Sequence, residues 1–268
     1  MIKIHDMKYS IARVFFFSLI LAVLGACAND ELTPYYDQRT QEPGKVVIQG
    51  YNAMIDSVQI AVNGKFIEIG KAKNNTAFVK KIEKNYEFVF FENEVKTFVI
   101  TNKRTKVILG TYQFTTQEPN SSLYFYVKED LWLDSAEFLK PGTLSQSGYA
   151  GFKFIFPSVN KYSASGYTGS LDGIITKNNG QLLGVAENIN KSTPSSFIEF
   201  PYSTPTGIKM ELVKHGTTES YIPGKKVIVS LTMTNNKSKY IVLEEKQDLN
   251  GAFSGVEGVI NLADYFSF

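Results

Sequence analysis

Short apolar runs that alternate with polar residues recur from residue 45 to the C-terminus, and this period of two constrains the fold more than any other feature. Successive side chains of a strand point to opposite faces, so each run can bury one face and expose the other. Asn63-Gly64, Asn179-Gly180 and Asn250-Gly251 separate such runs, and Asn-Gly supplies the positive φ angles of a tight hairpin turn. Since no stretch keeps a helical period, the pattern predicts an all-β protein.

The runs fall into two blocks, which predict two antiparallel, immunoglobulin-like β-sandwich domains in tandem. Each block carries short strands at the spacing typical of a sandwich, and the 20 Phe and 15 Tyr favour strands. Pro, Gly and Ser cluster in residues 140–150, which indicates a linker. We therefore expect domains at residues 45–142 and 143–268. Residues 131–139 fit either a short helix or a last edge strand, and no fixed-period repeat relates the blocks.

The N-terminus has the features of a secretory signal peptide over residues 1–26. Basic residues precede an apolar run at residues 14–24, which is too short to span a bilayer as a helix. Either Met1 or Met7 fits as the initiator. The run ends in Leu24-Gly25-Ala26-Cys27, which resembles the bacterial lipobox. That resemblance implies cleavage before Cys27 and a diacylglyceryl group on its sulfur, so we expect a membrane partner through this lipid anchor.

The residues after Cys27 resemble the export signal of surface lipoproteins in Bacteroidota-type bacteria. The acidic cluster is Ala28-Asn29-Asp30-Glu31, and the resemblance implies attachment to the outer membrane, facing the cell exterior. Which leaflet displays the protein stays open. Residues 27–44 are polar with two prolines and predict a flexible tether.

Two further resemblances concern short segments. Asp56-Ser57-Val58-Gln59-Ile60-Ala61-Val62-Asn63-Gly64 resembles the hairpin of an immunoglobulin-like domain of unknown function found in bacterial surface lipoproteins. It carries no catalytic residue. The triplets around Ser57 and Ser135 resemble the Asp-(Ser/Thr)-apolar acceptor for O-glycosylation of exported proteins in Bacteroidota-type bacteria, which implies modification at these two serines.

Charge and cysteine content exclude several classes of function. Of 28 basic and 26 acidic residues, three basic and one acidic precede residue 27, so equal numbers remain after it. A neutral chain lacks the basic footprint of nucleic-acid binding, and we expect no nucleic-acid partner. Cys27 is the only cysteine, so after lipidation none remains for a disulfide, and the hydrophobic cores must hold the fold.

The residues do not predict an enzyme, a cofactor or a metal site. His215 is the only histidine after residue 27, whereas a zinc site needs several His or Cys ligands. The chain has no nucleophile elbow and no metalloprotease motif. Asp130, Asp134 and Glu137 near Trp132 could form a glycosidase pair, but carboxylates at strand ends are more often solvated.

The remaining hypothesis is non-catalytic binding of a glycan or another nutrient ligand. Sugars stack on exposed aromatic rings while polar groups bind their hydroxyls. The candidate ligand-binding residues are Trp132 and five tyrosines in Gly/Ser/Pro contexts, Tyr149, Tyr162, Tyr167, Tyr202 and Tyr221. The alternative is an adhesive, pilus-like or structural component of the cell envelope that binds a surface protein through an edge strand.

Overall fold

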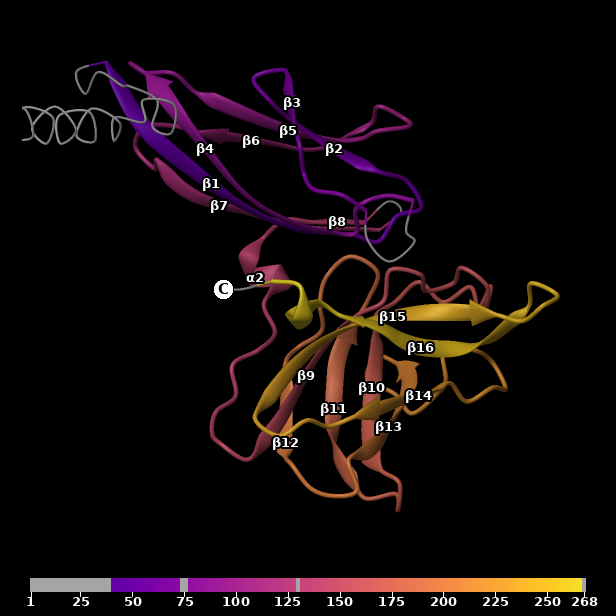
Figure 1. The fold of residues 1–268 in the computed structure, drawn as a ribbon. Coiled ribbons are helices and arrows are strands. Elements are labelled where there is room, and N and C mark those ends of the chain that lie inside the picture. Colours follow the sequence, from indigo (N-terminus) through magenta and orange to yellow (C-terminus); the bar gives the residue numbers. More distant parts are fainter. Residues whose placement is uncertain (1–39, 73–76, 129–130, 267–268) are drawn as a thin grey trace, which may run out of the picture.

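The computed structural model describes residues 40–72, 77–128 and 131–266, which form two β-sandwiches, one above the other in Figure 1. The predicted all-β fold of two sandwiches in tandem is confirmed. The predicted signal peptide, Cys27 and the predicted tether as far as residue 39 lie outside the described residues, as does Asp130. No helix in the described ranges is long and apolar enough to cross a membrane.

The first sandwich pairs a sheet of order β4-β1-β7-β8 with a sheet of order β3-β2-β5-β6. Most neighbours are antiparallel, but β1 and β7 run parallel. Phe98, Ile100, Leu123 and Phe125 are among the buried side chains between the two sheets. The strands are β1 (Gln41–Asn52), β2 (Val58–Val62), β3 (Lys65–Ile67), β4 (Lys81–Phe91), β5 (Lys96–Asn102), β6 (Ile108–Phe114), β7 (Asn120–Lys128) and β8 (Leu131–Leu133).

The second sandwich pairs a sheet of order β12-β9-β15-β16 with a sheet of order β11-β10-β13-β14. Its one parallel pair is β9 and β15. Phe152, Phe154, Phe156 and Met210 are among its buried core residues. The strands are β9 (Tyr149–Ile155), β10 (Leu171–Lys177), β11 (Leu182–Ile189), β12 (Ile198–Pro201), β13 (Gly207–Lys214), β14 (Ile228–Thr232), β15 (Lys237–Gln247) and β16 (Phe253–Asn261).

Strand β1 begins at Gln41, within the segment predicted as tether, so Pro43 and Gly44 belong to a strand. Over residues 41–44, β1 is paired with β4 alone, since its pairing with β7 starts at Lys45. A strand that is paired on one side tolerates proline, because the missing N–H is not needed on the open side.

The predicted hairpin at Asn63-Gly64 is confirmed. Asn63 and Gly64 have φ angles of 46° and 79°, the two positive values that a type I′ turn requires. They join β2 to β3, which pair in register from Val62 opposite Lys65.

For residues 131–139, both alternatives occur in succession, since β8 is followed by the single helical turn α2 (Ala136–Leu139).

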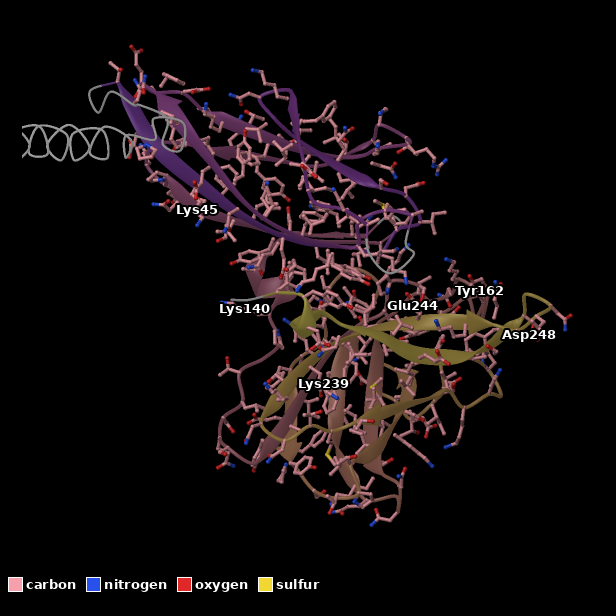
Figure 2. The ribbon with its side chains drawn as sticks, viewed as in Figure 1. Lys45, Lys140, Tyr162, Lys239, Glu244 and Asp248 are labelled. Atoms are coloured by element: carbon pink, nitrogen blue, oxygen red, sulfur yellow. The ribbon has the colours of Figure 1, made fainter. Side chains whose placement is uncertain are left out.

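A third buried cluster, which we call the seam, joins the two sandwiches. From the first sandwich and α2 it takes Tyr126, Leu133 and Leu139, and from β15 it takes Tyr240 and Val242. Lys128 at the end of β7 forms an ion pair with Glu244 of β15 beside this cluster, and Figure 2 shows Glu244 on the side of β15 toward the first sandwich. The short 3-10 turn η1 (Leu262–Asp264) adds the buried Leu262. Apolar packing therefore fixes the two sandwiches against each other.

Candidate functional site

The structure places the predicted ligand-binding aromatics in three separate regions. Trp132 belongs to the first sandwich, where its indole stacks on Phe125 with ring centroids 5.0 Å apart. A Cβ atom at Gly110 would lie 2.8 Å from the same indole. Trp132 is half-buried and packs on the core of the first sandwich, where Phe125 occupies one face of its indole.

The tyrosines divide between opposite ends of the second sandwich. Tyr149 opens β9 and lies opposite Pro201 of β12, and the backbone N–H of Tyr202 donates to Gly148 O at 2.8 Å. Tyr162 and Tyr167 lie in the loop that follows the other end of β9. Figure 2 shows Tyr162 on the same side as Asp248, beyond the end of β15, whereas Lys239 lies toward the opposite end. The five tyrosines therefore do not form one platform.

The prediction that Tyr221 contacts a ligand is wrong for this conformation, because its side chain is 0% exposed. Its ring packs edge-on against Phe156, with centroids 6.3 Å apart. Its hydroxyl donates to Glu245 Oε1 at 3.1 Å, so the one polar atom is satisfied inside the core. The Pro and Gly residues that follow Tyr221 predict a loop with an exposed ring, but the Tyr221 ring fills the interior beneath that loop.

A pocket of about 480 Å³ lies at the end of the second sandwich that carries Tyr167, and we call it the loop pocket. Its volume falls in the usual range for small-ligand sites. Two loops form it, the β9–β10 loop and the β11–β12 loop, over an apolar floor of Phe156, Leu171 and Ile189. Its polar lining comes from Asn160, Thr168, Ser170, Asn190, Lys191, Ser192 and Thr193. The lining therefore combines the Tyr167 ring, an apolar floor and a polar rim.

The β9–β10 loop is held by a buried carboxylate. Glu245 of β15 is 3% exposed. Its Oε2 accepts from the backbone N–H groups of Tyr162 and Ser163 at 2.7 and 2.9 Å. Its Oε1 accepts from the Asn160 N–H at 3.0 Å, the Ser163 hydroxyl at 2.6 Å and Tyr221. Five donors satisfy the carboxylate, so the loop that carries Tyr167 is fixed before any ligand arrives.

The β11–β12 loop is stiffened by Asn190. Its Oδ1 accepts from the N–H groups of Ser192 and Thr193 at 3.0 and 2.8 Å, and its Nδ2 donates to Thr193 Oγ1 at 2.6 Å. This is the side-chain mimic of a turn that asparagine favours. The Phe156 N–H donates to Asn190 O at 2.9 Å, which ties the two pocket loops together.

Three hydroxyl groups in the pocket are available for a ligand. The side chains of Thr168, Ser170 and Ser192 make no hydrogen bond within the described part of the chain. Tyr167 lines the same pocket and packs against the core, and its hydroxyl donates to Ser170 O at 3.0 Å. The half-buried ring is thereby held in one orientation, beside hydroxyls that can both donate and accept.

Behind the pocket, Asp172 fixes the loop after β13. It accepts from His215 Nδ1 at 2.8 Å and from the Gly216 N–H at 2.9 Å. Burial opposes ionisation of Asp172, but the bonds from Gly216, His215 and the Asn188 N–H outweigh it and lower the pKa of this carboxyl. The hydrogen bond and the charge of Asp172 raise the pKa of His215. Among the described residues, no three His, Cys, Asp or Glu side chains gather closely enough to hold a metal ion.

A second hollow, of about 630 Å³, lies toward the opposite end of β15 and is a poorer candidate for sugars. Lys237, Lys239 and Asp264 line it together with Ile241 and Ile260, and it contains no aromatic ring. Lys239 Nζ already donates to Thr232 O at 2.7 Å. Burial lowers the pKa of Lys239. This hollow lacks the ring on which a sugar would stack.

The remaining predicted residues lie in partly exposed loops. Ser57 directly precedes β2 and Ser135 directly precedes α2, and both are half-buried. Asp134 accepts a hydrogen bond from the Tyr112 hydroxyl at 2.7 Å, and that hydroxyl accepts from Trp132 Nε1 at 3.2 Å. Asp134 therefore closes a hydrogen-bonded chain at the surface of the first sandwich.

Sequence comparison identifies no relative, since no family model and no curated protein matches this chain. Two solved structures resemble parts of it. One, from a study of alpha-glucan recognition by family 41 carbohydrate-binding modules of streptococcal virulence factors, is 12% identical, covers 84% of this chain and 100% of its own, and has a TM-score of 0.25. The other, a family 26 carbohydrate-binding module from Eubacterium rectale Amy13K in complex with maltoheptaose, is 8% identical, covers 80% and 94%, and has a TM-score of 0.20.

Proposed function

We propose that this chain is a non-catalytic surface lipoprotein that binds an oligosaccharide in the loop pocket. The observation that carries the proposal is the half-buried Tyr167 ring beside three hydroxyl groups that lack partners within the described residues. A sugar ring offers an apolar face to an aromatic side chain and hydroxyls to polar groups, and this lining matches both.

The rim chemistry favours a neutral sugar. The described lining residues include no carboxylate, and Lys191 is the one charged side chain among them. Hydroxyl and amide groups discriminate by direction more than by charge, so a neutral glycan satisfies this lining without an unpaired buried charge. Because Glu245 and Asn190 already hold the two loops, binding requires little ordering of the chain.

The test is a glycan-array screen of residues 28–268 followed by calorimetry on the bound glycans. Tyr167→Ala removes the ring on which the sugar stacks. This change should weaken binding about tenfold, because losing about 1.4 kcal/mol of binding free energy raises the dissociation constant by a factor of ten. Tyr149→Ala is the matched control, because Tyr149 lies at the opposite end of the sandwich. Equal losses in the two variants, or a blank array, would contradict the proposal.

The location of the chain is part of the proposal and follows from the lipobox at Leu24-Gly25-Ala26-Cys27. A chain with two or three acyl groups on Cys27 stays on the membrane, whereas an unacylated chain does not. Cys27→Ser should therefore move the protein from the outer-membrane fraction of cells to the soluble fraction. Protease treatment of intact cells tests the outward orientation. If the wild-type protein faces the cell exterior, the protease should digest it. Retention of the Cys27→Ser chain in the membrane would contradict lipid anchoring.

A second candidate function, binding of a surface protein, is favoured by the edge strand β6. It ends its sheet. Ile108 at its start is 62% exposed, and Val107 just before it is 57% exposed. An uncovered edge can accept a strand from another chain. Crosslinking on whole cells tests this role. We expect a partner protein to crosslink to residues near Ile108, and we expect this crosslink to be lost in Ile108→Lys. Crosslinks confined to the second sandwich would contradict it.

A further inference from the structure

The two sandwiches have the same topology, although the sequence shows no repeat. In each, the fourth, first, seventh and eighth strands form one sheet, and the third, second, fifth and sixth form the other. Thus β1 corresponds to β9, β2 to β10, and so on to β8 and β16. The correspondence includes direction, because the first and seventh strands are the single parallel pair in each case.

The correspondence extends to individual residues beside the loop pocket. Val58 pairs with Asn102 in the first sandwich, as Leu171 pairs with Lys214 in the second. One position beyond each pair, the Lys103 N–H donates to Ser57 O at 2.8 Å, and the His215 N–H donates to Ser170 O at 3.0 Å. Ser57 is therefore the equivalent of Ser170, which lines the loop pocket.

The first sandwich has a pocket of about 440 Å³ at this equivalent place. Its lining includes Ile55, Asp56 and Ser57 from the β1–β2 loop, Phe78 from the β3–β4 loop, and Lys103 and Arg104 after β5. The β1–β2 and β3–β4 loops are the counterparts of the β9–β10 and β11–β12 loops that form the loop pocket. We call this hollow the upper pocket.

The upper pocket is a fixed, polar site with an apolar wall. Arg104 donates two hydrogen bonds to Asp56, at 2.6 and 2.8 Å. Hydrogen bonds from Arg104 and Asn102 lower the pKa of Asp56, so the pair stays ionised and in place. Ile55 is 87% exposed beside Phe78. The Lys103 ammonium has no carboxylate partner among the described residues and is free to donate to a ligand.

The chain passes from the seam into both pockets within one or two residues. Ala53, which packs on the seam, lies two positions before Ile55 of the upper pocket, and Ile155, buried in the seam, directly precedes Phe156 of the loop pocket. Because the seam is apolar and carries the Lys128–Glu244 ion pair, it keeps the two pockets at a constant separation. Two sites held together raise the effective concentration of a shared ligand.

We infer that the upper pocket is a second oligosaccharide-binding site, and that the chain binds one polysaccharide through both sandwiches. This inference rests on the proposed function of the loop pocket, whose ligand class it shares. The two sites have similar charge. In the upper pocket Asp56 neutralises Arg104, so Lys103 is the remaining charged group. In the loop pocket Lys191 is the one charged group of the lining. Neither presents an unpaired carboxylate to a sugar.

The experiment counts sites by calorimetry on residues 28–268. The probes are linear glucan, xylan, mannan and galactan oligosaccharides, from which the shortest one bound by wild type is taken, together with its parent polysaccharide. Ile55→Ala/Lys103→Ala empties the upper pocket, and the exposure of Ile55 lets the fold persist. Tyr167→Ala and Ser192→Trp disable the loop pocket by deletion and by filling. Phe66→Ala, an exposed apolar residue outside both pockets, is the matched control.

We expect wild type and Phe66→Ala to bind two short oligosaccharides, and each pocket variant to bind one. The parent polysaccharide should bind wild type at least about tenfold more tightly than either variant. If Ile55→Ala/Lys103→Ala keeps the wild-type stoichiometry and affinity while the loop-pocket variants lose all binding, the second site is refuted and the proposed function stands. If wild type binds none of the probes, both are refuted.

Discussion

The Tyr221 hydroxyl donates to Glu245 Oε1 at 3.1 Å inside the second sandwich, where both side chains are almost fully buried. Twenty-four positions separate them, so the contact is invisible to any local pattern. Through Glu245 it links the core to the backbone of the β9–β10 loop, and thus to the loop pocket. Rigidity of the candidate site therefore begins in the core rather than in the loop itself.

The first prediction concerns Glu245. Glu245→Gln replaces an oxygen that faces backbone N–H groups with an amide N–H₂, leaving buried donors unsatisfied. We expect the free energy of unfolding to fall by roughly 3 kcal/mol, because hydrogen bonds to a buried charge are individually worth 1.5–3 kcal/mol. Glu219→Gln is the control, because Glu219 is exposed and pairs with Lys214 at the surface, where ion pairs contribute about 0–1 kcal/mol. Urea denaturation of both variants measures the difference, and equal losses would contradict the assignment.

The second prediction compares two buried tyrosines of the same sandwich. The Tyr240 hydroxyl has no hydrogen-bond partner among the described residues, whereas the Tyr221 hydroxyl has one. Tyr240→Phe should therefore raise the free energy of unfolding or leave it unchanged, because an unsatisfied buried group costs about 1–3 kcal/mol. Tyr221→Phe should lower it by about 1 kcal/mol. Thermal denaturation ranks the two, and the reverse order would show that the hydroxyls are misassigned.

The third prediction concerns His215 and pH. Asp172 raises the pKa of His215 above its unfolded value, so the stabilisation is complete below about pH 6.5 and is lost as the pH rises through the folded pKa. The stability difference between wild type and His215→Gln should be larger at about pH 5.5 than at about pH 8.5. As the only histidine of residues 28–268, it also gives a single NMR titration. A midpoint below about 6.5 would contradict the pairing.

The fourth prediction concerns the seam. Val242→Asp places a carboxylate in the apolar cluster, where burial of an unpaired charge costs several kcal/mol. We expect calorimetry to show one unfolding transition for wild type and two for this variant, because the sandwiches then unfold separately. Val185→Asp, on an exposed position of β11, should keep a single transition. Two transitions in wild type would show that the seam does not couple the sandwiches.

The sequence predicted those features that depend on neighbouring residues. Alternation identified most strands, and Asn63-Gly64 marked a turn whose two φ angles are both positive. Alternation shows which side chains of a strand face inward. A strand alternates in the same way whichever other strand it pairs with, so the pattern does not identify its neighbours. It therefore could not predict that β1 runs parallel to β7, or that the consecutive strands β14 and β15 lie in different sheets.

The candidate site was only partly predictable for the same reason. The Gly/Ser context of Tyr167 predicts a loop residue, and the structure places Tyr167 in the loop pocket. Tyr221 has a similar context, yet its ring is buried because Glu245, far along the chain, satisfies its hydroxyl. The sequence signal that was missed is Asn190-Lys191-Ser192-Thr193, where an asparagine two positions before a serine favours a side-chain turn.

The measurement that tests the central claim most directly is an NMR titration of isotope-labelled residues 28–268 with a glycan bound on the array. The account predicts backbone amide shifts in residues 156–170 and 189–193 that saturate together, and their loss in Tyr167→Ala. Shifts that cluster instead around Tyr149 and Tyr202, or no shifts in the second sandwich at saturating glycan, would contradict it.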